Sequence, residues 1–297
     1  MKNDNRNDRR TSGAVTGTGK TKVTGKINAV GTPKMMTGKE KRTTVGQGRE
    51  KTTVKNKSGI CPVADKCGGC SWINQPYAEQ LKKKEKQLGE LLAPFCKIEG
   101  VIPMEHPEHY RNKIHAVFGE NRYHDAISGI YEQKSHRIVP VDSCLIENAK
   151  ADEIIVSIRG LLKSFHIRPY NEDTGYGLLR HVLIRTGHVT GQIMVVLVLA
   201  SPILPSKNNF VKALLKLHPE ITTVVINVNN RNTSMVLGDK EHVIYGKGYI
   251  EDELCGKRFR ISPKSFYQVN PVQTEILYGK ALEYAGLTGK ETVVDAY

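Results

Sequence analysis

The sequence predicts an α+β fold for residues 106–250, because this stretch alternates β-rich runs with segments of helical periodicity. Residues 178–186 and 192–200 are rich in aliphatic side chains and flank a short turn, which predicts a hairpin. Apolar residues recur at helical spacing over 152–165 and from Ser206 onward, which predicts two helices. The short connections between strands imply an antiparallel sheet that these helices cover on one face.

The two arms of the predicted hairpin differ in polarity. Polar and apolar residues alternate between Arg180 and Arg185, which predicts a strand with one solvent-exposed face. Residues 193–199 are apolar throughout, which is typical of a central strand. A further strand is predicted over 222–228, with a partner strand that ends at Leu237.

Two segments precede this central unit. Residues 59–105 hold a cysteine loop and then a run from Tyr77 to Leu92 with helical spacing, which Pro94 closes. Residues 1–58 carry 15 of the 44 Lys and Arg residues, only four of the 30 acids, and no Phe, Tyr or Trp. So little apolar side chain predicts a disordered tail. The tail either attracts phosphate backbones, or is a solvated extension with no partner, or is an upstream stretch translated from a misplaced start.

Charge and hydropathy restrict the class of protein. The formal net charge is +14; the tail contributes 15 − 4 = +11, and the remainder contributes 29 − 26 = +3. No apolar run reaches the roughly 18 residues that a membrane-spanning helix requires. No signal peptide is recognisable before the cysteines. We therefore expect a soluble, cytoplasmic protein with no membrane partner.

The most specific chemical feature is a group of three cysteines within ten residues, Cys61, Cys67 and Cys70, with Cys144 as a fourth candidate ligand. A spacing of five and then two residues brings three thiols to one point, and Gly68-Gly69 lets the backbone wrap closely around what they hold. An iron–sulfur cluster takes four cysteines, and so does a structural zinc. In a reducing compartment disulfides are not expected, so the spacing predicts a metal centre of either kind.

Two short basic clusters accompany the predicted strands. They are His109-Tyr110-Arg111-Asn112-Lys113 and Leu179-Arg180-His181. An aromatic ring beside cations can stack on a base while the cations hold phosphates, although a lone Arg or His on a strand is more often an ordinary solvent-facing residue. The candidate RNA-contacting residues are therefore Tyr110, Arg111, Lys113, Arg180 and His181.

Together these motifs resemble a known family. The cysteine cluster, the helix from Tyr77, the two basic clusters and residues 261–270 (Ile-Ser-Pro-Lys-Ser-Phe-Tyr-Gln-Val-Asn) occur in this order. In that order they resemble the iron–sulfur-containing RNA (uracil-5-)-methyltransferases that modify 23S ribosomal RNA in bacteria. The resemblance extends from about residue 59 to the last residue.

The resemblance implies a set of ligands and partners. Cys61, Cys67, Cys70 and Cys144 would ligate a [4Fe–4S] cluster, with zinc as the alternative. A related transfer RNA methyltransferase lacks the cluster, so these cysteines favour a ribosomal RNA substrate. We expect RNA and not DNA as the partner, and a monomer.

The resemblance also implies a doubly wound α/β methyltransferase domain that binds S-adenosylmethionine, of which residues 251–297 would be the first elements. Thr292–Val294 would form its first strand, and Gln268 and Tyr297 would contact the cofactor. Apolar surface around Ile276, Leu282, Val293 and Val294 is expected to be exposed, because the resemblance implies packing partners beyond these elements.

Family chemistry needs a thiolate that adds to C6 of uracil and a base that removes the C5 proton. The sequence reaches Tyr297 before the glycine-rich turn that follows in the family. We therefore expect an incomplete copy that lacks the catalytic residues and transfers no methyl group. Cys96 and Cys255 do not stand where the nucleophile belongs and are predicted to be small buried residues. Two alternatives are an inactive iron–sulfur RNA-binding protein and a zinc-bearing structural domain.

Overall fold

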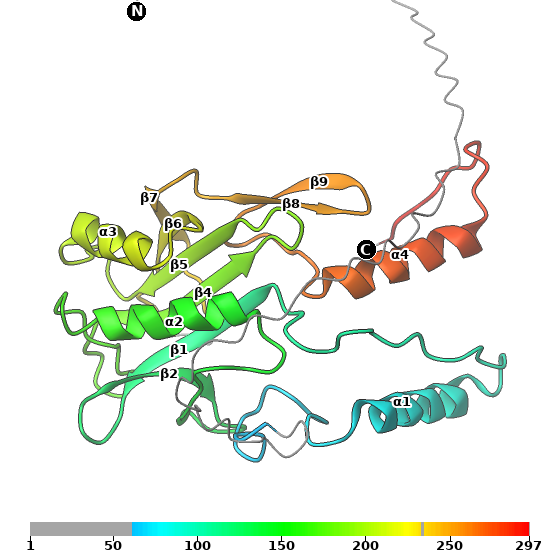
Figure 1. Ribbon diagram of the computed structural model, residues 1–297, viewed down its shortest axis with the longest axis horizontal. Helices are drawn as coiled ribbons and strands as arrows, with labels where there is room; N and C mark the ends of the chain where they lie inside the picture. The colour runs from blue at the N-terminus through cyan, green and yellow to red at the C-terminus, as the bar shows by residue number, and fades with distance from the viewer. Residues whose placement is uncertain (1–60, 233–234, 297) are drawn as a thin grey trace, which may run out of the picture. The chain divides into compact units, whose positions relative to one another are not determined.

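The computed structural model describes residues 61–232 and 235–296. They form a seven-stranded sheet in the order β3-β2-β1-β4-β5-β6-β7 and a two-stranded sheet β8-β9 (Figure 1). The predicted tail, residues 1–58, lies outside the described residues. The helices are α1 (Tyr77–Leu92), α2 (Ala149–Leu161), α3 (Lys207–Leu217) and α4 (Pro271–Ala285), and the strands are β1 (Lys113–Glu120), β2 (Ala126–Tyr131), β3 (Ile138–Pro140), β4 (Leu179–Thr186), β5 (Ile193–Leu199), β6 (Ile221–Val228), β7 (Lys240–Tyr245), β8 (Ile250–Leu254) and β9 (Lys257–Ile261).

The seven-stranded sheet is mixed. All neighbouring strands pair antiparallel except β5 and β6, which pair parallel. The chain leaves β5, forms α3 and re-enters the sheet in the same direction, as a helical crossover requires. The predicted hairpin β4–β5 and the helix that follows Ser206 are confirmed. The prediction of a wholly antiparallel sheet is wrong at the β5–β6 pair.

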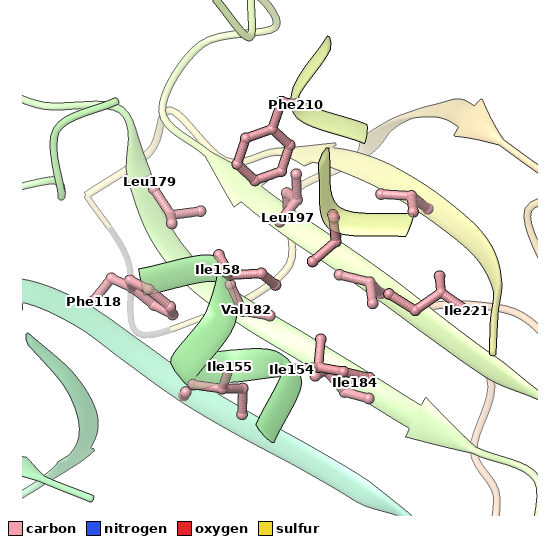
Figure 2. Close-up of a cluster of buried hydrophobic side chains, with 14 of the residues drawn as sticks. Phe118, Ile154, Ile155, Ile158, Leu179, Val182, Ile184, Leu197, Phe210 and Ile221 are labelled. Carbon is pink, nitrogen blue, oxygen red and sulfur yellow. The ribbon is translucent and has the colours of Figure 1, made fainter. Parts of the chain in front are cut away.

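Helices α2 and α3 cover one face of the sheet, as Figure 1 shows. In Figure 2, Ile154 and Ile158 of α2 and Phe210 of α3 lie over the strands that carry Val182 and Leu197. These side chains are buried, so apolar area removed from water holds the helices to the sheet.

The opposite face of the sheet is also covered, which the sequence did not predict. Leu183 and Val196 pack in a second buried cluster with Ile250, Ile261 and Tyr267 from the β8–β9 hairpin and the segment after it. All eight residues of β4 are consequently buried, so the expected solvent-exposed face of this strand is wrong. The predicted domain boundary after residue 250 falls at the start of this packed hairpin. All the predicted domain boundaries stay predictions.

Two element boundaries differ from prediction for local reasons. Helix α2 begins at Ala149 rather than Asp152, because Asn148 Oδ1 accepts hydrogen bonds from the backbone N–H groups of Lys150 (3.1 Å) and Ala151 (3.2 Å). The strand that pairs with β6 is Lys240–Tyr245, not one that ends at Leu237. Helix α1 spans Tyr77–Leu92 as predicted.

The region after β9 has one helix and a long extended end. Helix α4 begins with Pro271 in its first turn, and Asn270 Oδ1 caps it by accepting from Gln273 N–H. The predicted strand at 292–294 does not form among the described residues, because no neighbouring strand pairs with it. The predicted exposed apolar surface is confirmed at Ile276, Leu282, Val293 and Val294. No helix within 61–232 or 235–296 is long and apolar enough to cross a membrane.

Candidate functional site

The four cysteines predicted as metal ligands line a single cavity of about 230 Å³. Cys61, Cys67 and Cys70 come from the turns before α1, and Cys144 comes from the loop between β3 and α2. All four are free thiols and partly buried. The structure thus brings together thiols from two distant parts of the sequence.

Local hydrogen bonds shape the first three ligand positions. The backbone N–H of Cys67 donates to Val63 O at 2.8 Å, and the N–H of Ala64 donates to Cys61 O at 3.2 Å, so the loop turns tightly. Cys67 also forms an isolated antiparallel bridge with Glu132, next to β2. The N–H of Gly69 points to Cys67 Sγ at 3.4 Å, the kind of contact that stabilises a sulfur ligand.

Cys144 is held by the first turn of α2. Its backbone N–H donates to Asp152 Oδ2 at 2.8 Å. Burial raises the pKa of Cys144 to about 11, and the nearby carboxyl of Glu147 acts in the same direction. Burial and the neighbouring Asp152 raise the pKa of Glu147 as well. A neutral Cys144 must therefore lose its proton when it becomes a metal ligand.

The pKa of Cys70 depends on the neighbouring thiols. Burial raises its pKa, and Cys67 and Cys61 add to the rise, whereas the guanidinium of Arg111 opposes it. Mutual repulsion of thiolates is strong enough to matter only at short range. The loop therefore concentrates potential negative charge, which a bound cationic centre would neutralise.

In the described part of the chain, no group of three or more His, Cys, Asp or Glu side chains is arranged to hold one metal ion. A tetrahedral zinc needs four sulfurs at about 2.3 Å from one point. A cluster accepts one cysteine on each of several irons, so its ligands can stand further apart around a shared cavity.

The first predicted RNA cluster lies beside this cavity. Arg111 lines the cavity, and its Nε donates to Lys113 O at 3.1 Å. Tyr110 is partly buried, which raises its pKa. The pKa of Lys113 is lowered by burial and then by Arg185 and Arg111. These three residues keep some exposed surface, and RNA contact by them stays a prediction.

The second predicted cluster lies inside the protein. Arg180 is buried, and its guanidinium donates to the carbonyls of Asn229 (3.0 Å) and Arg231 (2.7 Å) and pairs with Glu172 at 3.1 Å. His181 is buried as well. Both side chains contact the protein itself, so their predicted contact with RNA would require exposure that this arrangement does not give.

The segment 262–270, which holds the predicted cofactor residue Gln268, is fixed by the end of the sheet. Asn112 Nδ2 donates to Gln268 O at 3.0 Å, and the N–H of Asn112 donates to Val269 O at 3.1 Å. The buried Arg185 donates to the carbonyls of Pro263 (3.2 Å) and Ser265. Tyr297, the other predicted cofactor residue, lies outside the described residues.

The buried carboxylate of Asp252 also anchors the segment 262–270. Tyr267 Oη donates to Asp252 Oδ2 at 3.2 Å, and the backbone N–H groups of His188 and Val189 each donate to this carboxylate at 2.9 Å. Burial raises the pKa of Tyr267, and Asp252 adds to the rise. The segment is therefore held at both ends while Phe266, 87% exposed, projects into solvent.

The two remaining cysteines differ from prediction. Cys96 and Cys255 are exposed, not buried. Cys255 stands at a tight turn between β8 and β9 with φ = 50°, and its N–H donates to Glu275 Oε1 at 2.7 Å. Turn geometry, rather than core packing, thus decides the place of Cys255.

Sequence reasoning missed three residues that line the cysteine cavity. Glu147 and His115 were not singled out, and Arg111 was considered only for RNA. A signal for Glu147 was available, because it follows Cys144 by three residues. His115 gave no signal, since a single histidine in a strand is common.

The chain is similar in sequence to proteins from several organisms. No family model matches the chain. The chain is 43% identical over 242 residues to a protein of Caldanaerobacter subterraneus described as an uncharacterised RNA methyltransferase, and 43% over 242 residues to one of Halalkalibacterium halodurans. Another, from Clostridium acetobutylicum, is 42% identical over 245 residues. Each match covers 80% of this chain and 53% of the relative, so the chain spans about half the length of these curated relatives.

The chain is also similar in fold to a solved structure. It is the crystal structure of the Pyrococcus abyssi tRNA (uracil-54, C5)-methyltransferase in complex with S-adenosyl-L-homocysteine, with a TM-score of 0.61 and 24% identity. The match covers 73% of this chain and 51% of that chain. The chain is therefore similar in sequence to proteins described as RNA methyltransferases, and similar in fold to part of a solved RNA methyltransferase.

Proposed function

We propose that this chain is the RNA-binding and metal-bearing part of an S-adenosylmethionine-dependent methyltransferase that modifies C5 of a uridine in 23S ribosomal RNA. The observation that carries the proposal is the 43% identity, over 80% of the chain, to a protein described as an RNA methyltransferase. The fold shared with a tRNA (uracil-54, C5)-methyltransferase supports uracil C5 as the target and the methionine-derived cofactor.

The cysteine cavity supports ribosomal rather than transfer RNA as the substrate, because the resemblance associates a [4Fe–4S] cluster with the ribosomal enzymes. Cys61, Cys67, Cys70 and Cys144 would hold the cluster in the cavity that they line. When bound, the cluster would supply a structural link between the cysteine loop and the loop before α2. Methyl transfer moves no electron, so we assign the cluster no redox step.

The described residues contribute binding and positioning. Asn112 and Arg185 hold the backbone of segment 262–270, so that Gln268 can contact the cofactor. Addition to C6 and proton removal at C5 need a thiolate and a base. No cysteine of this sequence stands where the resemblance requires the nucleophile. The proposed role of the described residues is accordingly to bind RNA and to position the segment 262–270.

A binding assay on the purified chain tests the substrate. A fluorescent 23S ribosomal RNA fragment and a transfer RNA of similar length are titrated at one salt concentration, since affinity depends on salt. We expect tighter binding of the ribosomal fragment. Equal or tighter binding of transfer RNA would overturn the ribosomal assignment.

Iron and sulfide analysis tests the cluster. After anaerobic reconstitution we expect a coloured protein with iron and sulfide in equal amounts, and loss of both in Cys144→Ser. Cys96→Ser is the matched control, because Cys96 is exposed and does not line the cavity. A colourless protein that binds one zinc in the same cysteines would replace the cluster by the zinc alternative.

A further inference from the structure

A groove of about 770 Å³ lies beside the cysteine loop and shares Cys70, Tyr110 and Arg111 with the predicted metal and RNA residues. Its walls come from residues 69–77, the first turns of α1, residues 101–111, and the first turn of α4. We call it the Trp72 groove, after the single tryptophan of the chain, which lines it. A volume of this size exceeds what a water layer needs and is typical of a ligand site.

The groove combines aromatic rings with cations. Trp72, Tyr77 and Tyr110 line it together with Lys84 and Arg111. The Nζ of Lys84 lies 6.0 Å from the centre of the Trp72 ring, so cation and ring face the same space. An aromatic ring next to a cation can stack on a base while the cation holds the adjacent phosphate.

Carboxamide side chains complete the lining. Gln80 uses its Nε2 to donate to Gln75 O at 2.9 Å, and Asn270 caps α4, so these two are partly committed. Across the residues that the structure describes, the side chains of Asn74 and Gln273 have no hydrogen-bond partner, although both line the groove. Free carboxamides offer both donors and acceptors, which suits the Watson–Crick edge of an unpaired base.

We propose that the Trp72 groove binds an unpaired segment of RNA, with one base stacked on Trp72 and the flanking phosphates held by Lys84 and Arg111. The proposal rests on the proposed function, which makes RNA the partner. A duplex does not fit this chemistry, because its bases are already stacked and paired on the edges that Asn74 and Gln273 would read.

Tryptophan fluorescence tests the proposal on the full 297-residue chain, because all tryptophan emission comes from Trp72. A single-stranded RNA oligonucleotide is titrated while emission is recorded, and the anisotropy of a labelled copy reports total binding in parallel. We expect quenching that saturates with the anisotropy curve, and little quenching with the same sequence as a duplex. Saturating anisotropy without quenching would overturn the groove and leave the proposed function standing. No binding in either readout would overturn both.

Two substitutions separate the groove from diffuse attraction. Trp72→Ala is expected to weaken single-strand binding about tenfold, the scale of one lost base stack. Lys84→Gln is expected to make the slope of log affinity against log salt shallower by about 0.7, the value for one phosphate contact on a single strand. The matched control is Lys86→Gln, since Lys86 is exposed on α1 but does not line the groove. Equal effects of Lys84→Gln and Lys86→Gln would overturn the proposal.

A protein occupant would give a different result. If a second copy of the chain fills the groove, Trp72 emission changes with chain concentration in the absence of RNA, and RNA fails to quench it. That pattern would also overturn the proposal. Emission that is independent of chain concentration, with circular dichroism of Trp72→Ala equal to that of the parent chain, leaves RNA quenching as the direct measure of the groove.

Discussion

The imidazole rings of His115 on β1 and His181 on β4 lie 4.8 Å apart, centre to centre, at an angle of 51°. They are diagonal neighbours, because His181 pairs with Val117. Within the described residues, His115 Nε2 and His181 Nδ1 are buried without a hydrogen-bond partner. Two adjacent rings in this state must both remain neutral, because a charge there would have no partner and would repel the next ring.

This pair predicts that the protein loses stability in mild acid. Burial, with Lys113 adding, lowers the pKa of His115 to about 4, and burial, with His115 and Arg180 adding, lowers that of His181 to about 3. Below the ordinary pKa of 6.5, these two histidines bind protons in the unfolded chain but stay neutral in the folded chain until their lowered pKa values are reached. The free energy of unfolding is therefore expected to fall by up to about 1.4 kcal/mol per pH unit for each histidine as pH drops from 6 to 4.

Urea denaturation at several pH values measures this slope. His181→Leu is expected to flatten it, because one of the two histidines whose pKa is lowered by folding is then missing. The control is His106→Gln, which removes an exposed histidine and should leave the slope unchanged. An equal slope in the parent chain and in His181→Leu would contradict the burial of the pair.

The contact between Arg185 and the segment 262–270 carries a second prediction. Arg185→Met removes the donors to the carbonyls of Pro263 and Ser265 while keeping an unbranched side chain. We expect a loss of about 1.5–3 kcal/mol in the free energy of unfolding, the range for a hydrogen bond to a charged group. Hydrogen exchange by mass spectrometry should show faster exchange at 262–268.

Arg258→Met is the matched control for that experiment. Arg258 is an exposed residue of β9 that pairs only loosely with Glu253 at 3.4 Å. It should change the free energy of unfolding by less than about 1 kcal/mol, as exposed ion pairs do. Equal exchange of 262–268 in the two variants would show that Arg185 does not position this segment.

A third prediction concerns the close contact of Gly129 on β2 with Val139 on β3. A Cβ at Gly129 would lie 1.9 Å from Val139 O. Because this oxygen belongs to the backbone of β3, only a movement of the backbone can relieve the clash. Gly129→Ala is expected to cost about 1–3 kcal/mol through overpacking. Gly160→Ala near the end of α2 meets nothing within 4 Å and should instead stabilise by about 0.5–1 kcal/mol. Thermal unfolding of both variants distinguishes a steric effect from a general effect of added methyl groups.

Local sequence patterns predicted the elements well and their environment poorly. The apolar run 193–199 and the helix from Ser206 follow from periodicity that acts within one element. The exposed face of β4 was predicted wrongly, because its cover comes from Ile250, Ile261 and Tyr267, far along the chain. The alternation between Arg180 and Arg185 predicts a solvent-exposed face. In the structure these two cations are buried and donate hydrogen bonds to backbone carbonyls.

The same limit applies to the sites. Cysteine spacing predicts a metal centre, since Cys61, Cys67 and Cys70 lie within one loop and carry their own geometry. The Trp72 groove has no comparable signature, because α1 and the first turn of α4 supply opposite parts of its lining. A site assembled from distant segments becomes visible only when the fold brings them together.

The shared wall between the cysteine cavity and the Trp72 groove predicts that loss of the proposed metal centre weakens the proposed RNA binding. Cys70, Ile73 and Arg111 line both spaces, so a loop released from the metal no longer holds the groove in place. Metal binding and loop folding are coupled in sites of this kind. We expect the Cys144→Ser chain to bind single-stranded RNA more weakly, with reduced quenching of Trp72, and the Cys96→Ser chain to behave as the parent. RNA affinity and Trp72 quenching that are identical with and without the metal would show that the groove stands independently of the cysteine loop.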